Sequence, residues 1–241
     1  MSASAAVRAA VSVARAHGLT VSSPLVLRHL SNTLIWLRPA PVVARVATAT
    51  ALVRSPAAFL ERDLAVSAYL AARGVPVVPA SGELPPGPHA HSGFTMTFTQ
   101  HVPHDLSVVP SPASFASLLA SLHAELARYP GPLPVAMPFD DMAALGCAAP
   151  DRPAGGAARP LHGDAHPGNL LWTPAGPVWN DFEDTWLGPV EWDLACLLHT
   201  QRLDGAAAVA AYPGAYSPAA VSAWLTVRRA HAACWTEVLS R

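Results

Sequence analysis

Residues 161–184 read LHGDAHPGNLLWTPAGPVWNDFED, and this stretch places two histidines and four acidic residues around two short apolar runs. The runs Leu170–Trp172 and Val178–Trp179 have the composition of short strands, and a Pro/Gly turn separates them. We therefore predict a β-hairpin. Such a hairpin would hold Asn169, just before its first strand, close to Asp181, just after its second.

Asp164 precedes Asn169 by five positions, so a loop can direct its carboxylate into the same cleft. Oxygen donors of this kind suit Mg²⁺, which prefers a few carboxylates together with water and substrate phosphates. The D-x-x-x-x-N spacing equals that of the kinase catalytic loop, in which the Asp accepts the substrate hydroxyl proton and the Asn helps to hold a metal ion. The stretch therefore indicates phosphoryl transfer by Asp164, with Asn169 and Asp181 as metal ligands.

The composition describes a globular chain with room for two small lobes, because 51% of its 241 residues are hydrophobic and only 13% are charged. No run approaches the roughly 18 apolar residues of a membrane helix, so no membrane is expected. The N-terminal stretch fits an amphipathic first helix better than a signal peptide. The three cysteines Cys147, Cys196 and Cys234 suggest neither an even disulfide set nor a metal pair, which favours a reducing cytoplasm.

All fifteen basic residues are arginine, so chemistry that requires a lysine is excluded and any phosphate-binding cation must be a guanidinium group. Residues 1–130 carry nine arginines against five acids, whereas residues 131–241 carry six against eleven. There is no basic stripe with interleaved aromatic residues, so no nucleic-acid partner is expected. The positive half suits a small anion, and the negative half could hold cations.

Hydrophobic periodicity and turn residues predict an α+β chain. The first part contains a hairpin of Thr33–Leu37 and Val42–Ala47 around the turn Arg38–Pro41, a helix from Pro56 to Arg73, and a strand from Phe94 to about His101. The remainder contains a strong helix from Pro112, a short one at Asp141–Leu145, one from Asp193 to about Leu203, and a last one from Pro218 to the end. The expected arrangement is a small antiparallel lobe followed by a mainly helical lobe.

Three motifs carry a resemblance to a known family: HGDAHPGN at residues 162–169, NDFEDT at 180–185 and GPVEWDLACLL at 188–198. In this order they resemble the aminoglycoside phosphotransferase and choline kinase-like group of small-molecule kinases. The resemblance implies a two-lobed protein kinase-like fold. Its N-lobe, residues 1–101, would bind the nucleotide, and its C-lobe, residues 102–241, would carry catalysis and bind the acceptor.

The resemblance also implies supporting roles within these motifs. His162 would brace the catalytic loop through hydrogen bonds, and Glu183 would be a further partner of the metal ion. Asp193 would cap its helix and tie the loop backbone rather than touch substrate.

On the nucleotide side, Arg45 in VVARVA stands where the family offers a Lys or Arg to the phosphates. Its acidic partner on the next helix would be Asp63 or Glu61. The backbone of Gln100 and Val102 would contact the base. The turn Arg38–Pro41 lacks glycine and therefore cannot copy a Gly-rich phosphate loop.

The expected activity is Mg²⁺-dependent transfer of the terminal phosphoryl group of ATP or GTP to the hydroxyl group of a small molecule. The excess of acids in the second half could attract an aminoglycoside or a quaternary amine, while other antibiotics and simple alcohols remain open as acceptors. The oligomeric state is also open. Two alternatives are a pseudokinase-like nucleotide-binding module and a metal hydrolase with His162, Asp164 and His166 around Zn²⁺.

Overall fold

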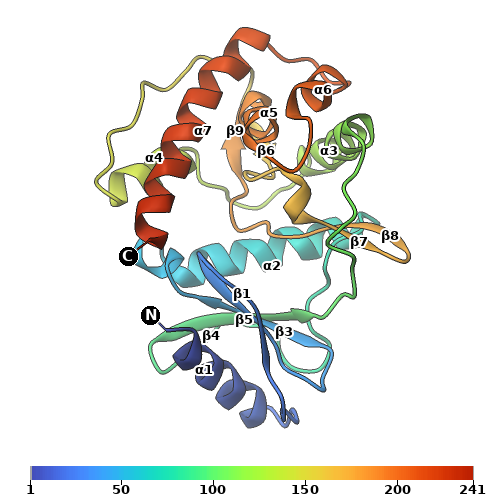
Figure 1. The fold of residues 1–241 in the computed structure, drawn as a ribbon, viewed down its shortest axis with the longest axis vertical. Helices are drawn as coiled ribbons and strands as arrows, with labels where there is room; N and C mark the ends of the chain where they lie inside the picture. Colours follow the sequence, from blue (N-terminus) through green and yellow to red (C-terminus); the bar gives the residue numbers. More distant parts are fainter. Residues whose placement is uncertain (1, 241) are drawn as a thin grey trace.

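The computed structural model describes residues 2–240, and a five-stranded antiparallel sheet occupies the first hundred of them (Figure 1). Its strands, in spatial order, are β1 (Leu25–His29), β2 (Asn32–Trp36), β3 (Val42–Ala47), β5 (Phe94–Gln100) and β4 (His89–His91). The register pairs Arg45 of β3 with Leu34 on one side and Thr97 on the other. Arg45 is therefore held on a central strand, where the backbone positions its side chain rigidly.

Successive side chains of a strand point to opposite faces of the sheet, so the two faces of β3 carry different residues. Val42, Ala44 and Val46 of β3 point to one face, where helix α1 (Ala3–Ala16) packs its buried alanines and Val13 against them. Residues at the intervening positions, including Arg45, point to the opposite face. Figure 1 shows α1 on the outer face of the sheet and α2 on the inner face, beside the rest of the chain. The sheet thus presents Arg45 toward the second half of the molecule.

Helix α2 (Pro56–Ala72) joins the sheet to the remaining helices. It begins with Pro56 at its first turn, where the missing N–H costs nothing. Phe59 and Leu60 pack on the sheet residue Ala47, while Val66 and Leu70 belong to the core of the second half. The helix therefore buries apolar side chains on two sides and fixes the sheet against the second half of the chain.

The second half is mainly helical and carries two small two-stranded sheets (Figure 1). Its helices are α3 (Pro112–Leu126), α4 (Met137–Ala144), α5 (Val190–His199), α6 (Gly205–Ala210) and α7 (Pro218–Leu239). Its strand pairs are β6 (Arg159–Leu161) with β9 (Trp186–Gly188), and β7 (Leu170–Thr173) with β8 (Gly176–Trp179). Short 3-10 turns η1 (Thr50–Leu52) and η2 (Pro167–Asn169) precede α2 and β7.

The predicted fold class is confirmed: the chain is an α+β protein with an antiparallel sheet followed by a mainly helical part. The hairpins β2–β3 and β7–β8 form as predicted. The boundary between residues 101 and 102 stays a prediction.

Three details differ from the sequence prediction. Strand β1 was not predicted, because all five of its residues are exposed and show no alternation. Helix α4 begins at Met137 rather than Asp141, and α5 spans Val190–His199 rather than 193–203. The N-cap of α5 is Pro189, so the expectation that Asp193 caps this helix is wrong.

The cysteines also differ from expectation, because Cys147 and Cys234 form a disulfide. They lie 87 positions apart, and the packing of α4 and its following loop on α7 brings their Cα atoms to 6.3 Å. Sequence spacing could not show this pair, and its presence removes the cysteine argument for a reducing compartment. Within residues 2–240, no helix combines the length and hydropathy that crossing a membrane requires.

Asp141 of α4 is the centre of a buried polar network that joins three segments. Its carboxylate accepts hydrogen bonds from Arg54, which precedes α2, and from the His231 and Trp235 rings of α7. Burial alone would raise the pKa of Asp141, but Arg54 and His231 outweigh burial and lower it to about 2. The ionised carboxylate therefore stabilises the docking of α7 on α4.

We predict that Asp141→Asn lowers the free energy of unfolding by about 2 kcal/mol at pH 6, as the shifted pKa implies. Because the folded-state pKa lies below the unfolded value of 3.8, the stabilisation is complete above about pH 4 and is lost as the pH falls toward 2. Urea unfolding at several pH values measures both effects. The neighbouring exposed Asp140→Asn is the matched control, and equal stability of the two variants at pH 6 would contradict the assignment.

Candidate active site

The loop that carries Asp164 is fixed by the backbone of the two residues before it. The N–H groups of His162 and Gly163 donate to the two carboxylate oxygens of Asp193, each at 2.9 Å. Asp193 is fully buried on α5, and its Oδ2 also lies 2.8 Å from the His123 ring of α3. The loop is therefore tied to α5 and α3, which is the backbone role that the resemblance implies for Asp193.

Gly163 is required by the close approach of two loops. Its φ is +90°, and a Cβ atom at this position would lie 1.8 Å from the carbonyl oxygen of Asp184. An L-residue would meet both an unfavourable backbone conformation and a clash with backbone. The loop of Asp164 and the segment of Asp184 are thus packed backbone to backbone.

His162 braces the same loop, as the resemblance implies. Its Nδ1 accepts from the N–H of Asp164 at 3.3 Å, and its Nε2 donates to the carbonyl of Asn180 at 3.1 Å. Because both ring nitrogens are occupied within the protein, His162 has none to offer to a metal ion. Among residues 2–240, no group of three or more His, Cys, Asp or Glu side chains is placed to hold a metal ion. The Zn²⁺ hydrolase alternative is therefore unsupported.

The carboxylate of Asp164 is held in one orientation by Arg228 and His166. Its Oδ1 accepts from Arg228 Nη2 of α7 at 2.8 Å, and its Oδ2 lies 3.3 Å from His166 Nε2. Burial would raise the pKa of Asp164, but the charges of Arg228 and His166 outweigh it and hold the pKa well below its ordinary value. Asp164 is thus ionised at neutral pH, as a group that accepts a proton or orients a hydroxyl must be.

Asn169 and Asp181 are brought together by the β7–β8 hairpin, as predicted. The N–H of Asn180 donates to the carbonyl of Asn169 at 3.0 Å, so the residues before and after the hairpin lie side by side. The Asn169 amide nitrogen donates to the Asp164 backbone carbonyl at 2.9 Å, which leaves its side-chain oxygen as a donor for a metal ion. Asp181 has a φ of +71°, an uncommon conformation that turns its carboxylate toward Arg45.

Arg45 joins this region to the sheet. Its guanidinium lies 2.7 Å from Asp181 Oδ1, 3.1 Å from Glu183 Oε2 and 3.7 Å from Asp63 Oδ2. The open choice between Asp63 and Glu61 is settled, because Asp63 is buried beside Arg45 and Glu61 is exposed. One arginine thus faces three carboxylates.

Glu183 shows the consequence of this excess of negative charge. Burial and the charge of Asp181 raise its pKa to about 8, against the opposing effect of Arg45. The amide nitrogen of Asn32 on β2 donates to both Glu183 oxygens, at 3.0 and 2.8 Å. A divalent cation bound by the free oxygens of Asn169 and Asp181 would neutralise the excess, so the donor set fits Mg²⁺.

A cavity of about 400 Å³ opens next to these residues, between the inner face of the sheet and the β7–β8 hairpin. Apolar side chains of Leu34, Val43 and Leu171 line its walls, while Asn169 and Asp181 line its polar end. Its remaining lining includes the polar side chains of Arg28, Arg45, Gln100 and Arg202, together with Val102. Five of the six residues predicted to bind the nucleotide or the metal ion therefore line one cavity: Arg45, Gln100, Val102, Asn169 and Asp181. The sixth, Asp63, does not line it and contacts Arg45 instead.

The segment at Gln100 and Val102 lies at the rim of this cavity. The N–H groups of Gln100 and His101 already donate to the carbonyls of Pro79 and Pro41. Gln100 can therefore offer only its carbonyl to a base, and the N–H group left to donate is that of Val102.

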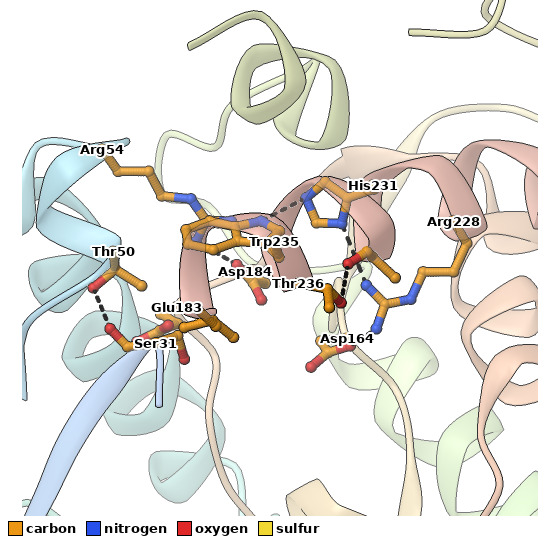
Figure 2. A pocket seen from close by; sticks show the side chains of 12 residues that line it. Ser31, Thr50, Arg54, Asp164, Glu183, Asp184, Arg228, His231, Trp235 and Thr236 are labelled. Carbon is orange, nitrogen blue, oxygen red and sulfur yellow. Dashed lines mark hydrogen bonds and ion pairs between the residues drawn. The ribbon is translucent and has the colours of Figure 1, made fainter. Parts of the chain in front are cut away.

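A second cavity, of about 230 Å³, is lined by Asp164 (Figure 2). Figure 2 shows Arg228, His231 and Trp235 of α7 on one side of it and Ser31 and Thr50 of the N-terminal half on the other. Its lining also includes Arg54, Glu183 and Asp184. Asp164 lines this inner cavity, whereas Asn169 and Asp181 line the larger one.

Sequence reasoning missed four arginines at these cavities. Arg28 and Arg202 line the larger cavity, and Arg54 and Arg228 line the inner one. The absence of lysine was the available signal, because every cation of a phosphate site must then be an arginine. No local pattern showed which arginines they are, since Arg228 reaches Asp164 across 64 positions.

Comparisons with known proteins agree with this geometry. The model of the family described as "Phosphotransferase enzyme family" matches residues 138–229. The choline kinase of Streptococcus pneumoniae has a TM-score of 0.64 at 13% identity, over 96% of this chain and 90% of that one. The chain has a protein kinase-like fold. The resemblance stated from the motifs is confirmed, and it supports a small-molecule phosphotransferase.

Two further structures share the kinase-like fold. APH(2″)-IIia, solved with GDP and kanamycin, has a TM-score of 0.64 at 17% identity, with 90% of this chain and 85% of that one covered. A microcompartment-associated aminopropanol kinase has a TM-score of 0.60 at 18% identity, with coverage of 95% and 92%. The comparison with curated proteins gives no match.

We predict that Gly163→Ala destabilises the protein by at least about 2 kcal/mol more than Gly176→Ala, because overpacking against backbone adds to the strain of a positive φ. Gly176 is a matched control, since its φ is +117° and a Cβ there meets nothing within 4 Å. Urea unfolding of the two variants gives the difference. Equal losses would show that the approach to Asp184 is not a constraint.

Proposed function

We propose that this chain is a Mg²⁺-dependent phosphotransferase that moves the terminal phosphoryl group of ATP or GTP to a hydroxyl group of a small molecule. One observation carries the proposal: Asp164 faces the inner cavity, while Asn169 and Asp181 face the adjoining larger one. A donor in the larger cavity and an acceptor in the inner one would therefore meet at a single ionised carboxylate.

In this proposal, residues 1–101 form the nucleotide-binding lobe and residues 102–241 the catalytic and acceptor-binding lobe. The base would lie between the apolar side chains of Leu34 and Leu171, near the Gln100 carbonyl and the Val102 N–H. Arg45 would neutralise donor phosphates, because it is a buried guanidinium at the polar end of that cavity. GTP is retained beside ATP because APH(2″)-IIia was solved with GDP.

Asn169 and Asp181 would hold Mg²⁺, with Glu183 as a neighbouring acid. When bound, the metal ion supplies positive charge that offsets the charge of the donor phosphates. Asp181 keeps one carboxylate oxygen on Arg45, so the protein itself orients this ligand. The amicoumacin kinase that shares this fold was solved with AMP-PNP and Ca²⁺, which supports a nucleotide with a divalent cation.

Asp164 would orient the acceptor hydroxyl and take its proton as the oxygen attacks the terminal phosphorus in line with the leaving oxygen. Arg228 holds one carboxylate oxygen at 2.8 Å, so the other oxygen, which has the longer contact to His166, is the one available to the hydroxyl. The chain's contribution is therefore mainly position and charge, as expected for phosphoryl transfer.

Asp164→Asn is predicted to keep nucleotide binding within about twofold and to lower kcat by at least about 100-fold, because the amide cannot accept the hydroxyl proton. Transfer of labelled γ-phosphate to pooled alcohols measures the loss, and calorimetry measures nucleotide affinity. The exposed Asp151→Asn is the control. Full activity of Asp164→Asn would refute the catalytic assignment, while binding without transfer in the unmodified chain would favour the binding-module alternative.

Asp181→Ala is predicted to abolish Mg²⁺-dependent nucleotide binding, because it removes the carboxylate of the proposed metal pair. Calorimetric titration with ATP, with and without Mg²⁺, separates metal-dependent affinity from the rest. The same titration of Asp184→Asn is the comparison, because Asp184 forms an ion pair with Arg54 and does not line the larger cavity. An unchanged response of Asp181→Ala to Mg²⁺ would overturn this ligand assignment.

A further inference from the structure

A groove adjoins the inner cavity, and its lining combines apolar side chains with polar groups. The groove has a volume of about 560 Å³, and Leu239 lines both spaces. The same segments border both: the β1–β2 turn gives Ser31 to the cavity and Leu30 to the groove, and the segment after β3 gives Thr50 and Leu52. The two spaces therefore adjoin at Leu239.

The carboxylates of the inner cavity are already paired with arginines. Asp164 is 2.8 Å from Arg228, Asp184 binds Arg54, and Glu183 is 3.1 Å from Arg45. Each of these three acids therefore has an arginine partner, although Glu183 shares Arg45 with Asp181 and Asp63. An acceptor with several ammonium groups would have to break these pairs and would also meet the positive charges of Arg54 and Arg228.

The groove presents apolar side chains to solvent. Leu52 is 71% exposed, Leu30 46% and Leu239 41%. The rest of its lining is Ala49, Ala144, Leu145, Val238, Thr48 and His29, with no Asp, Glu or Arg among these residues. An apolar group placed there would remove this surface from water and would need no counter-charge.

We propose that the acceptor is a small alcohol with an uncharged apolar arm: its hydroxyl lies at Asp164 in the inner cavity, and its arm lies along Leu30, Leu52 and Leu239. This inference rests on the proposed function, and it names the substrate class of the same site. The groove adjoins the cavity of Asp164 at Leu239, which favours the arm of the acceptor as the occupant of the groove. A polycationic aminoglycoside does not fit the paired charges.

The first test compares acceptors that differ in one property. With Mg²⁺ and ATP, and separately GTP, kcat/KM is measured for 1-propanol, 1-hexanol, 6-amino-1-hexanol and kanamycin. We expect kcat/KM to rise about three- to fourfold for each added CH₂ between propanol and hexanol, because each one is buried in the groove. The terminal ammonium of aminohexanol is expected to cancel most of this gain, and kanamycin to be a poor acceptor.

The second test changes the groove. Leu52→Ser and Leu30→Ser are expected to raise KM for 1-hexanol about five- to tenfold, with kcat and the propanol reaction unchanged, because both residues line the groove and neither lines the inner cavity. Both residues are exposed, so the substitutions spare the core. Val135→Ser is the matched control, because Val135 is 59% exposed and lines neither space. Unchanged KM values in both groove variants would overturn the proposal.

The outcomes separate this inference from the proposed function. Preferred transfer to kanamycin or aminohexanol would confirm a kinase and overturn the inference. If no acceptor is phosphorylated, the proposed function fails for these compounds, and calorimetry on Asp164→Asn decides the inference: hexanol binding that Leu52→Ser weakens supports it, and equal or tighter binding of kanamycin overturns it.

Discussion

The buried carboxylate of Asp193 is the interaction on which the arrangement of the site depends. It accepts the N–H groups of His162 and Gly163 and contacts His123, so it connects the catalytic loop to two helices at once. Because the Asp193 side chain is completely buried, both of its oxygens need hydrogen-bond donors within the protein. The loop satisfies Asp193, and Asp193 determines where Asp164 can lie. Helices α3 and α5 and the loop that carries Asp164 are thus joined through this one carboxylate.

Much of the site was predictable because its residues are close in sequence. Asp164, Asn169 and Asp181 fall within 18 positions, and the β7–β8 hairpin that joins them is a local structure with clear turn and strand signals. Arg45 and Asp63 required the register of β3 and the phase of α2, which alternation and helical spacing indicate in part. The motifs showed where the catalytic-loop and hairpin residues lie along the chain. The resemblance to a known family supplied the expected arrangement of the sheet and the helices in space.

The remainder depends on contacts that no local pattern encodes. Arg228 and Arg54 reach the inner cavity from α7 and from the segment before α2, and their carboxylate partners lie 64 and 130 positions away. Strand β1 is exposed along its whole length, so it lacks the alternation by which strands are recognised. The Cys147–Cys234 pair likewise follows from helix packing. The charges that surround the inner cavity were therefore visible only in the folded chain.

The ion pairs between the two halves also have a consequence for how the molecule exchanges its contents. Arg45 bonds Asp181 and Glu183, Asn32 bonds Glu183, and Arg54 bonds Asp141 and Asp184, all from the N-terminal half to the helical half. Separating the two halves would leave several buried charges without their partners at the same time. The free-energy cost would far exceed that of moving a surface loop. If the larger cavity holds a nucleotide as proposed, the nucleotide is expected to enter and leave while the two halves stay joined, on the side where the exposed His104 and Leu106 line the cavity.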